Sequence, residues 1–247
     1  MFFAVLFIPQ SSIPLICALC LVLAVMLWEV YRSVEAHKVL WIVGYIAAIL
    51  VMSSIIFSGV TVSVTMSVTV ILYFIAMVFL HGIVDYQKIM SHCLLTYYIT
   101  FFMGSLIMIR NEYGVLALLL TFICAWITDT GAYFSGRFLG KHKLIPKVSP
   151  KKTVEGAIGG TILCIIAVLI YVHVLGLVKS DSIVYTIVFA LITSVLSQFG
   201  DLVASSIKRD CEIKDFGNLL PGHGGLTDRF DSVMFIAPIV LYLLKFM

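Results

Sequence analysis

The sequence has few charged residues. Lysine, arginine, aspartate and glutamate make up 12% of its 247 residues, whereas soluble proteins carry roughly 25%. Hydrophobic residues reach 62%. This balance excludes a water-soluble domain, a disordered chain and a protein that binds nucleic acid over a broad basic surface. We therefore predict an all-α fold, a polytopic transmembrane helical bundle that forms a single integral membrane domain over residues 1–247.

Several familiar motifs are also missing. The chain contains no GxxxxGK[ST] phosphate loop and no G-x-G-x-x-G dinucleotide fingerprint. Its six cysteines are scattered, five of them in apolar runs, which argues against a disulfide framework or a zinc site. Cys17 and Cys20 form a C-x-x-C inside an apolar run, which we interpret as helix packing. The first ten residues carry no basic side chain, so we expect mature protein there rather than a secretory signal.

Eight apolar runs are long enough to cross a bilayer, since a spanning helix takes about 20 residues. We expect about eight spans, with seven and nine as alternatives, divided into N-terminal spans (1–110) and C-terminal spans (111–247). The expected spans lie near 12–31, 39–57, 61–80, 92–109, 113–134, 155–178, 182–205 and 231–247.

Basic residues gather on one side of this bundle. Thirteen of the 16 Lys and Arg residues fall there, and the positive-inside rule makes that side cytoplasmic. Two loops on it, residues 135–154 and 206–230, hold ten basic residues together with acids, glycines and prolines, and we expect them to be the catalytic loops. Isolated polar residues elsewhere are interpreted as span boundaries without partners: Glu29, Glu35, His81, Asp85 and His92.

The segment from Gln198 to Asp231 holds the most informative pattern. Asp201, Ser205 and Lys208 are spaced four and three residues apart, so they share one helix face. A carboxylate in a spanning helix is costly and by default indicates a functional site. An Asp201–Lys208 ion pair that merely ends the helix is the structural alternative.

Asp228 and Asp231 stand three residues apart at the start of the last span. With Asp201 they supply three hard oxygen donors near one interface. Such a set suits Mg²⁺, in one or two ions, because this metal keeps water and substrate phosphates as its remaining ligands. Basic residues that interleave with these acids would hold phosphate: Lys208, Arg209, Lys214 and Arg229.

Two further segments could bind phosphate. Lysines and hydroxyls precede the sixth span, where a helix N-terminus attracts anions, and Thr153 could also act there as the N-cap. Residues 221–225 (Pro-Gly-His-Gly-Gly) can bend around an anion or form a plain turn. His223 could be a phosphate donor, a proton carrier or a loop hydrogen-bonder. The candidate residues before the sixth span are Ser149, Lys151, Lys152 and Thr153.

Two patterns concern the fifth and sixth spans. Asp129 and Tyr133 share one face of the fifth span, so we expect them in or beside the site, with a hydrogen bond to a neighbouring helix as the alternative for Asp129. Gly156 and Gly160 form a G-x-x-x-G, which is typical of close helix packing.

These residues resemble the signature of the phosphatidate cytidylyltransferase family, the CDP-diacylglycerol synthases. The resemblance covers about residues 126–232. Two upstream motifs also fit, Asp129-x3-Tyr133-Phe-x-Gly136-Arg137-x2-Gly140-Lys141 and Ser149-Pro-Lys-Lys-Thr-x-Glu-Gly. The main signature reads Ser205-x-Ile-Lys208-Arg209-x4-Lys214-Asp215-x-Gly217-x2-Leu220-Pro221-x-His223-Gly224-Gly225-Leu-x-Asp228-Arg229-Phe-Asp231.

The resemblance implies condensation of CTP with phosphatidic acid to CDP-diacylglycerol and pyrophosphate, dependent on Mg²⁺. Asp201, Lys208 and Asp228 would be catalytic, and Asp201, Asp228 and Asp231 would hold the metal. Asp129 and Tyr133 would support the site from beside it. The residues expected to bind substrate are Ser149, Lys151, Lys152, Thr153, Ser205, Arg209, Lys214, Asp215, His223 and Arg229.

The expected partners are CTP, phosphatidic acid and the bilayer, with no nucleic acid and with a homodimer left open. The short chain favours a bacterial plasma membrane. A CTP-using kinase of lipid alcohols, or a cytidylyltransferase for ether lipids, would handle the nucleotide in the same way. A secondary transporter is a third reading, but it predicts charges near the bilayer midplane and paired repeats.

Overall fold

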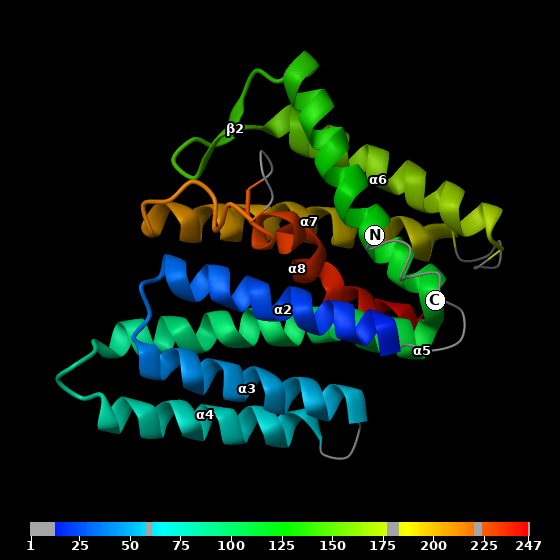
Figure 1. Cartoon of the computed structure of the whole chain (residues 1–247). Coiled ribbons are helices and arrows are strands. Elements are labelled where there is room, and N and C mark those ends of the chain that lie inside the picture. Colours follow the sequence, from blue (N-terminus) through cyan, green and yellow to red (C-terminus); the bar gives the residue numbers. More distant parts are fainter. Residues whose placement is uncertain (1–12, 58–60, 177–182, 220–223, 247) are drawn as a thin grey trace. The chain divides into compact units, whose positions relative to one another are not determined.

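The computed structural model describes residues 13–57, 61–176, 183–219 and 224–246 (Figure 1). Helices dominate these residues, and a short antiparallel hairpin accompanies them. In chain order the elements are α2 (Ile13–Ser33), α3 (Lys38–Phe57), α4 (Val62–Phe79), α5 (Tyr86–Leu139), β1 (Lys143–Ile145), β2 (Ser149–Thr153), α6 (Val154–Val174), α7 (Ile183–Asp210), α8 (Thr227–Leu243) and the 3₁₀ turn η2 (Leu244–Phe246).

Six helices in the described part of the chain, α2 to α7, are long and apolar enough to cross a membrane. The all-α polytopic membrane fold predicted from composition is therefore confirmed. The last expected span corresponds to α8, which begins four residues earlier than expected, at Thr227, and contains Pro238. Helices α5 and α7 also run five residues beyond the expected spans, to Leu139 and Asp210.

Helix α5 accounts for two of the expected spans. Its 54 residues are more than twice the roughly 20 that one bilayer span takes. Gly114 interrupts it with a φ of 84° and a ψ of −175°, a conformation that suits glycine because it lacks a Cβ. The break falls beside the polar residues that separate the expected spans 92–109 and 113–134.

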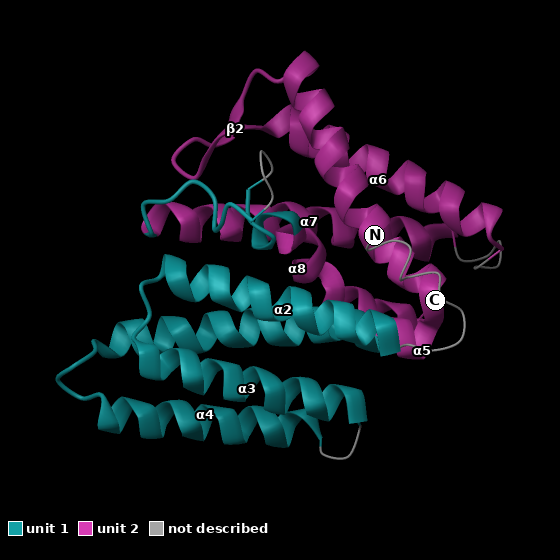
Figure 2. Cartoon of the chain, viewed as in Figure 1, with its two compact units in different colours: residues 1–108, 211–229 teal, residues 109–210, 230–247 magenta. Residues whose placement is uncertain are grey.

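The chain divides into two compact units, coloured separately in Figure 2. Unit 1 contains residues 1–108 and 211–229, and unit 2 contains residues 109–210 and 230–247. The loop after α7, residues 211–226, thus groups with the N-terminal helices. Within unit 1, α3 packs against α2 and α4, and within unit 2, α6 packs against α7.

A buried polar network ties the helices of unit 1 together. The hydroxyls of Tyr31 and Tyr73 each lie 2.8 Å from Oγ1 of Thr96, and Tyr73 also contacts Nδ1 of His92 at 2.9 Å. The His92 ring is fully buried and stacks on Tyr31. The interpretation of His92 as a boundary residue without partners is therefore wrong, because its partners come from helices distant in sequence.

Glycines bring α5 and α6 together in unit 2. A Cβ on Gly160 would lie 2.6 Å from the carbonyl oxygen of Thr128, and one on Gly156 would lie 2.7 Å from that of Ala132. Any larger residue would force the helices apart. The G-x-x-x-G thus serves close packing, as predicted. Thr153 caps α6 by accepting a hydrogen bond from the Gly156 N–H at 3.1 Å.

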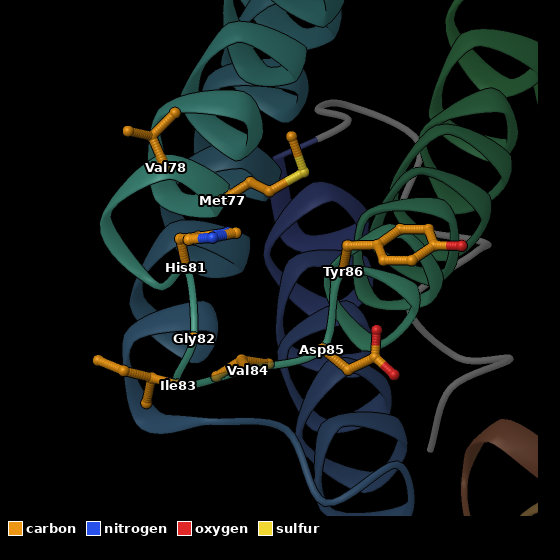
Figure 3. A pocket seen from close by; sticks show the side chains of 8 residues that line it. All are labelled: Met77, Val78, His81, Gly82, Ile83, Val84, Asp85 and Tyr86. Atoms are coloured by element: carbon orange, nitrogen blue, oxygen red, sulfur yellow. The ribbon is translucent and has the colours of Figure 1, made fainter.

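The turn between α4 and α5 forms a hollow of about 680 Å³ in unit 1 (Figure 3). His81 and Asp85 lie on its wall, between the two helices, where the sequence places span boundaries. Asp85 begins α5 by accepting a hydrogen bond from the Gln87 N–H at 3.1 Å. Asp85 therefore serves the turn.

Candidate active site

Helix α7 presents the predicted polar face at its last turns. The hydroxyl of Ser205 donates a hydrogen bond to Oδ1 of Asp201 at 3.2 Å, and Lys208 follows one turn later with 8% of its surface exposed. A lysine this deeply buried needs nearby negative charge. The helical spacing therefore places Asp201 and Ser205 in contact, and Lys208 follows on the same helix face.

Asp201 forms an ion pair that the sequence did not suggest. Its Oδ2 lies 2.7 Å from Nζ of Lys152, and both side chains are half-buried. Lys152 belongs to β2, and its ammonium also donates to the carbonyl oxygen of Gln198 at 3.3 Å. The hairpin thereby places the ammonium group of Lys152 against the face of α7 that carries Asp201.

Glu155, in the first turn of α6, holds the start of this hairpin. Its carboxylate accepts hydrogen bonds from the N–H groups of Lys141 and His142 at 3.1 and 3.2 Å, and His142 Nδ1 lies 2.6 Å from it. Strand β1 then pairs antiparallel with β2. Of the loop expected at 135–154, residues 135–139 thus belong to α5, and the hairpin of β1 and β2 follows.

A polar cavity of about 340 Å³ lies inside unit 2, between the second part of α5, the hairpin, α6 and α7. Arg137 also lines it and donates a hydrogen bond to the Tyr133 hydroxyl at 2.9 Å. The sequence indicates Arg137 only as part of the upstream motif and does not predict it as a site residue. Its spacing of four residues from Tyr133 places both side chains on one helix face, and this spacing could have indicated Arg137 as a site residue. The predicted site residues on the cavity wall are Asp129, Tyr133, Ser149, Lys151, Lys152, Thr153 and Asp201.

A cluster of three carboxylates lies beside this cavity. Asp231, which is 7% exposed, has Asp201, Asp129 and Lys208 as its charged neighbours. One oxygen of Asp231 accepts a hydrogen bond from the Ser232 N–H at 2.6 Å, and Ser232 also lies beside Asp129. Three acids gathered in one place repel one another, and the ammonium groups of Lys152 and Lys208 offset part of this repulsion.

This donor set fits Mg²⁺ in its chemistry. All three side chains offer hard oxygen atoms, which are the ligands that this ion prefers. No three acidic, histidine or cysteine side chains converge into a preformed metal cage within the described residues. Mg²⁺ usually binds through one or two carboxylates and completes its shell with water and substrate phosphates, so a preformed cage is not required.

Asp228 joins the two described parts of the loop after α7, residues 211–219 and 224–226. Oδ2 of this residue accepts hydrogen bonds from the Phe216 N–H at 2.9 Å and from the Gly225 N–H at 3.0 Å. Gly224 has a φ of 79°, a conformation that disfavours larger residues, and a Cβ there would lie 3.3 Å from Oδ1 of Asp215. Asp228 therefore shapes the backbone of its own loop, a role that the sequence did not reveal.

Four of the remaining predicted residues lie at the end of α7, in the loop after it and in the first turn of α8. Arg209 ends α7, and Arg229 lies in the first turn of α8; both are exposed. Lys214 and Asp215 are exposed in the loop of unit 1. His223, with Pro221 and Gly222, lies outside the described residues.

Glu29 is the largest correction to the interpretation from sequence. Instead of lying unpartnered at a span boundary, its carboxylate is fully buried and accepts hydrogen bonds from Leu226 and Thr227. A signal existed, because Glu29 is the first charged residue of the chain and sits within an apolar run. Its partners, almost 200 residues away, leave no local pattern.

The fold and the site define a polytopic helical membrane protein that holds lysines and carboxylates around a polar cavity. A model of the cytidylyltransferase family matches residues 1–247, and the chain belongs to that family.

Curated relatives share part of this sequence. The phosphatidate cytidylyltransferase of Bacillus subtilis is 45% identical over 138 residues, which are 55% of this chain and 51% of the relative. The enzymes of the same name from Staphylococcus saprophyticus and Staphylococcus aureus are each 45% identical over 135 residues, with the same two shares. The similarity thus spans about half the length of these relatives.

Proposed function

We propose that this chain transfers the cytidylyl group of CTP to phosphatidic acid, forming CDP-diacylglycerol and releasing pyrophosphate. The observation that carries the proposal is the polar cavity, in which Lys151 and Lys152 share a wall with Asp201. Bases that hold phosphate next to an acid that can hold a metal are the parts that nucleotide transfer requires. Membership of the family and the names of the relatives support these substrates.

The mechanism follows from the charge of the lipid headgroup. The phosphate of phosphatidic acid is already an oxyanion, so its attack on the α-phosphorus of CTP needs no strong base. The new P–O bond forms in line with the breaking bond to pyrophosphate, which departs with the electron pair. The protein then contributes positioning and charge neutralisation. Lys151, Lys152 and Lys208 would hold phosphate oxygens.

Mg²⁺ is the proposed cofactor, with Asp201 and Asp231 as ligands and Asp228 as the further ligand that the sequence predicts. When bound, the ion would offset negative charge on the CTP phosphates. Lys152 would exchange its pairing with Asp201 for a phosphate oxygen as substrate arrives. Asp129 and Tyr133 would support the site from α5.

An apolar groove adjoins the polar cavity. This hollow of about 550 Å³ lies between α6 and α7 and is lined almost entirely by apolar side chains. It shares Leu144, Ala157 and Gln198 with the wall of the polar cavity. We place an acyl chain of phosphatidic acid in this groove and the phosphate in the polar cavity, because the chain then stays in apolar surroundings while its headgroup reaches Lys152.

Val195→Trp tests the groove. Val195 lines it from α7, so an indole there should obstruct a long acyl chain and raise the KM for dioleoyl phosphatidic acid by about tenfold or more. The KM for CTP, and the KM for a dihexanoyl substrate, should stay within about twofold of wild type. Val188→Trp, on an exposed part of α7 away from the groove, is the matched control. An equal effect on both lipids would contradict the assignment.

The catalytic side is proposed to face the cytoplasm of a bacterium. Thirteen of the 16 basic residues lie on that side in the predicted topology, and CTP is a cytoplasmic metabolite. The protein would then take its lipid from the plasma membrane and its nucleotide from solution. The assembly of two copies into a homodimer remains a prediction outside this proposal.

A direct test of the function incubates the purified protein with phosphatidic acid and CTP. The CTP is labelled either in the cytosine ring or in the γ-phosphate, and the fate of each label is followed. We expect ring label in the lipid and γ-label in released pyrophosphate, both abolished by EDTA and restored by Mg²⁺. Transfer of the γ-label to a lipid alcohol would instead identify a kinase. Transport of a substrate into proteoliposomes without CTP would identify a transporter.

A further inference from the structure

A carboxylate from the first described helix caps the last one. Glu29 of α2 has no exposed surface. Its Oε1 accepts a hydrogen bond from the Leu226 N–H at 2.8 Å, and its Oε2 accepts from the Thr227 N–H and the Thr227 hydroxyl, each at 2.8 Å. The first amides of a helix have no partner within the helix, and they carry partial positive charge. Glu29 thus caps the N-terminus of α8 from another helix.

The loop backbone fits closely around this carboxylate. A Cβ on Gly225 would lie 2.9 Å from both oxygens of Glu29, and a Cβ on Gly217 would collide with the same side chain. One turn after Glu29, the hydroxyl of Ser33 lies 3.4 Å from the carbonyl oxygen of Phe216. Helix α2 therefore contacts the described parts of this loop, residues 211–219 and 224–226, at two places, both within unit 1 (Figure 2).

The carboxylates of Glu29 and Asp228 together accept hydrogen bonds from three consecutive backbone amides. The N–H of Gly225 donates to Asp228, and those of Leu226 and Thr227 donate to Glu29. A shift of Glu29 would therefore move the backbone on which Asp228 sits. Two buried or half-buried carboxylates at one short segment are costly unless each is fully hydrogen-bonded. This cost suggests a role beyond joining two helices.

We propose that Glu29 is a positioning residue: it fixes residues 224–226 and the start of α8 so that the Asp228 carboxylate is held ready for the metal–nucleotide complex. The proposal rests on the proposed function for the reaction that Asp228 serves. Glu29 itself touches neither substrate nor metal in this assignment and acts through the backbone amides of Leu226 and Thr227.

Glu29→Gln is the sharpest test, because the amide matches the carboxylate in shape but replaces one acceptor oxygen with a donor. Amide hydrogen exchange of peptides covering Gly224–Arg229, measured without metal or substrate, should accelerate by about tenfold or more. In the enzyme assay, the Mg²⁺ concentration for half-maximal rate should rise by about fivefold or more, with the rate partly recovered at high Mg²⁺. Glu35→Gln, an exposed carboxylate just beyond α2, is the control and should match wild type in both measurements.

A purely structural role would give a different pattern, namely a lower melting temperature and less active protein with an unchanged Mg²⁺ midpoint, and would overturn the proposal. Amide hydrogen exchange at the wild-type rate in the peptides covering Gly224–Arg229 would also overturn the proposal. If Glu29→Gln is not recovered folded, Thr227→Val decides, since it removes one of the three hydrogen bonds and should show the same two changes at smaller size. Absence of cytidylyl transfer by wild type would overturn the proposed function instead, while the exchange data would still show whether Glu29 fixes the loop.

Discussion

Asp201→Asn is expected to lower turnover by about a thousandfold, or about 4 kcal/mol of transition-state stabilisation, while the protein stays folded. Asparagine keeps an oxygen that can accept the hydrogen bond from Ser205, so the end of α7 should remain intact. The negative charge is lost, however. Lys152 then has no ion-pair partner at 2.7 Å, and the proposed Mg²⁺ ligand becomes a neutral amide that binds this ion poorly.

The measurement is the initial rate of CDP-diacylglycerol formation by the purified variant, together with its melting temperature in the same detergent. Asp210→Asn is the matched control, because it removes an exposed carboxylate from the last residue of the same helix. It should retain wild-type turnover. A rate for Asp201→Asn within about threefold of wild type would remove Asp201 from the metal site and leave it as a structural partner of Lys152.

Much of the fold could be predicted from hydropathy, because a spanning helix must be apolar over its whole length. The ends of the helices were harder to predict. Helices α5 and α7 continue into polar residues as far as Leu139 and Asp210, since the backbone keeps its hydrogen bonds in water as well as in lipid. The break in α5 falls at Gly114, after the polar residues 110–112, because a positive φ rather than polarity interrupts the helix.

The site could be predicted where its geometry is local. The face that carries Asp201, Ser205 and Lys208 follows from the helical repeat, and the cap at Thr153 follows from the preference for a hydroxyl before a helix. The ion pair from Lys152 to Asp201 depends on how a hairpin packs against α7, which no spacing records.

The same limit applies to Glu29. It accepts hydrogen bonds from residues 197 and 198 positions away, and a single sequence carries no trace of a contact at that distance. The sequence does show a carboxylate in an apolar helix. Its burial is energetically unfavourable unless a specific partner is present. Isolated charges in spans are therefore better interpreted as parts of a site until a structure shows otherwise.

Asp228→Asn and Asp228→Ala should separate two roles of one side chain. Oδ2 of Asp228 accepts two backbone hydrogen bonds, from Phe216 and Gly225, and the carbonyl oxygen of asparagine has the two lone pairs needed to accept both. We expect Asp228→Asn to keep the loop folded but to lose turnover by about a hundredfold or more, because the charge proposed for the metal is gone. Asp228→Ala should be as inactive, and it should also lose stability, since two loop amides then lack an acceptor at about 1–3 kcal/mol each.

Turnover, melting temperature and the Mg²⁺ midpoint, measured side by side on both variants, distinguish these roles. Glu212→Gln, an exposed carboxylate in the same loop, should behave as wild type in all three. If Asp228→Asn kept more than about a third of wild-type turnover while Asp228→Ala lost it, the side chain would serve the loop alone, and the metal would rest on the carboxylates of unit 2. If both variants are inactive but only the alanine variant is destabilised, the charge of Asp228 acts in the reaction and its hydrogen bonds act in the fold.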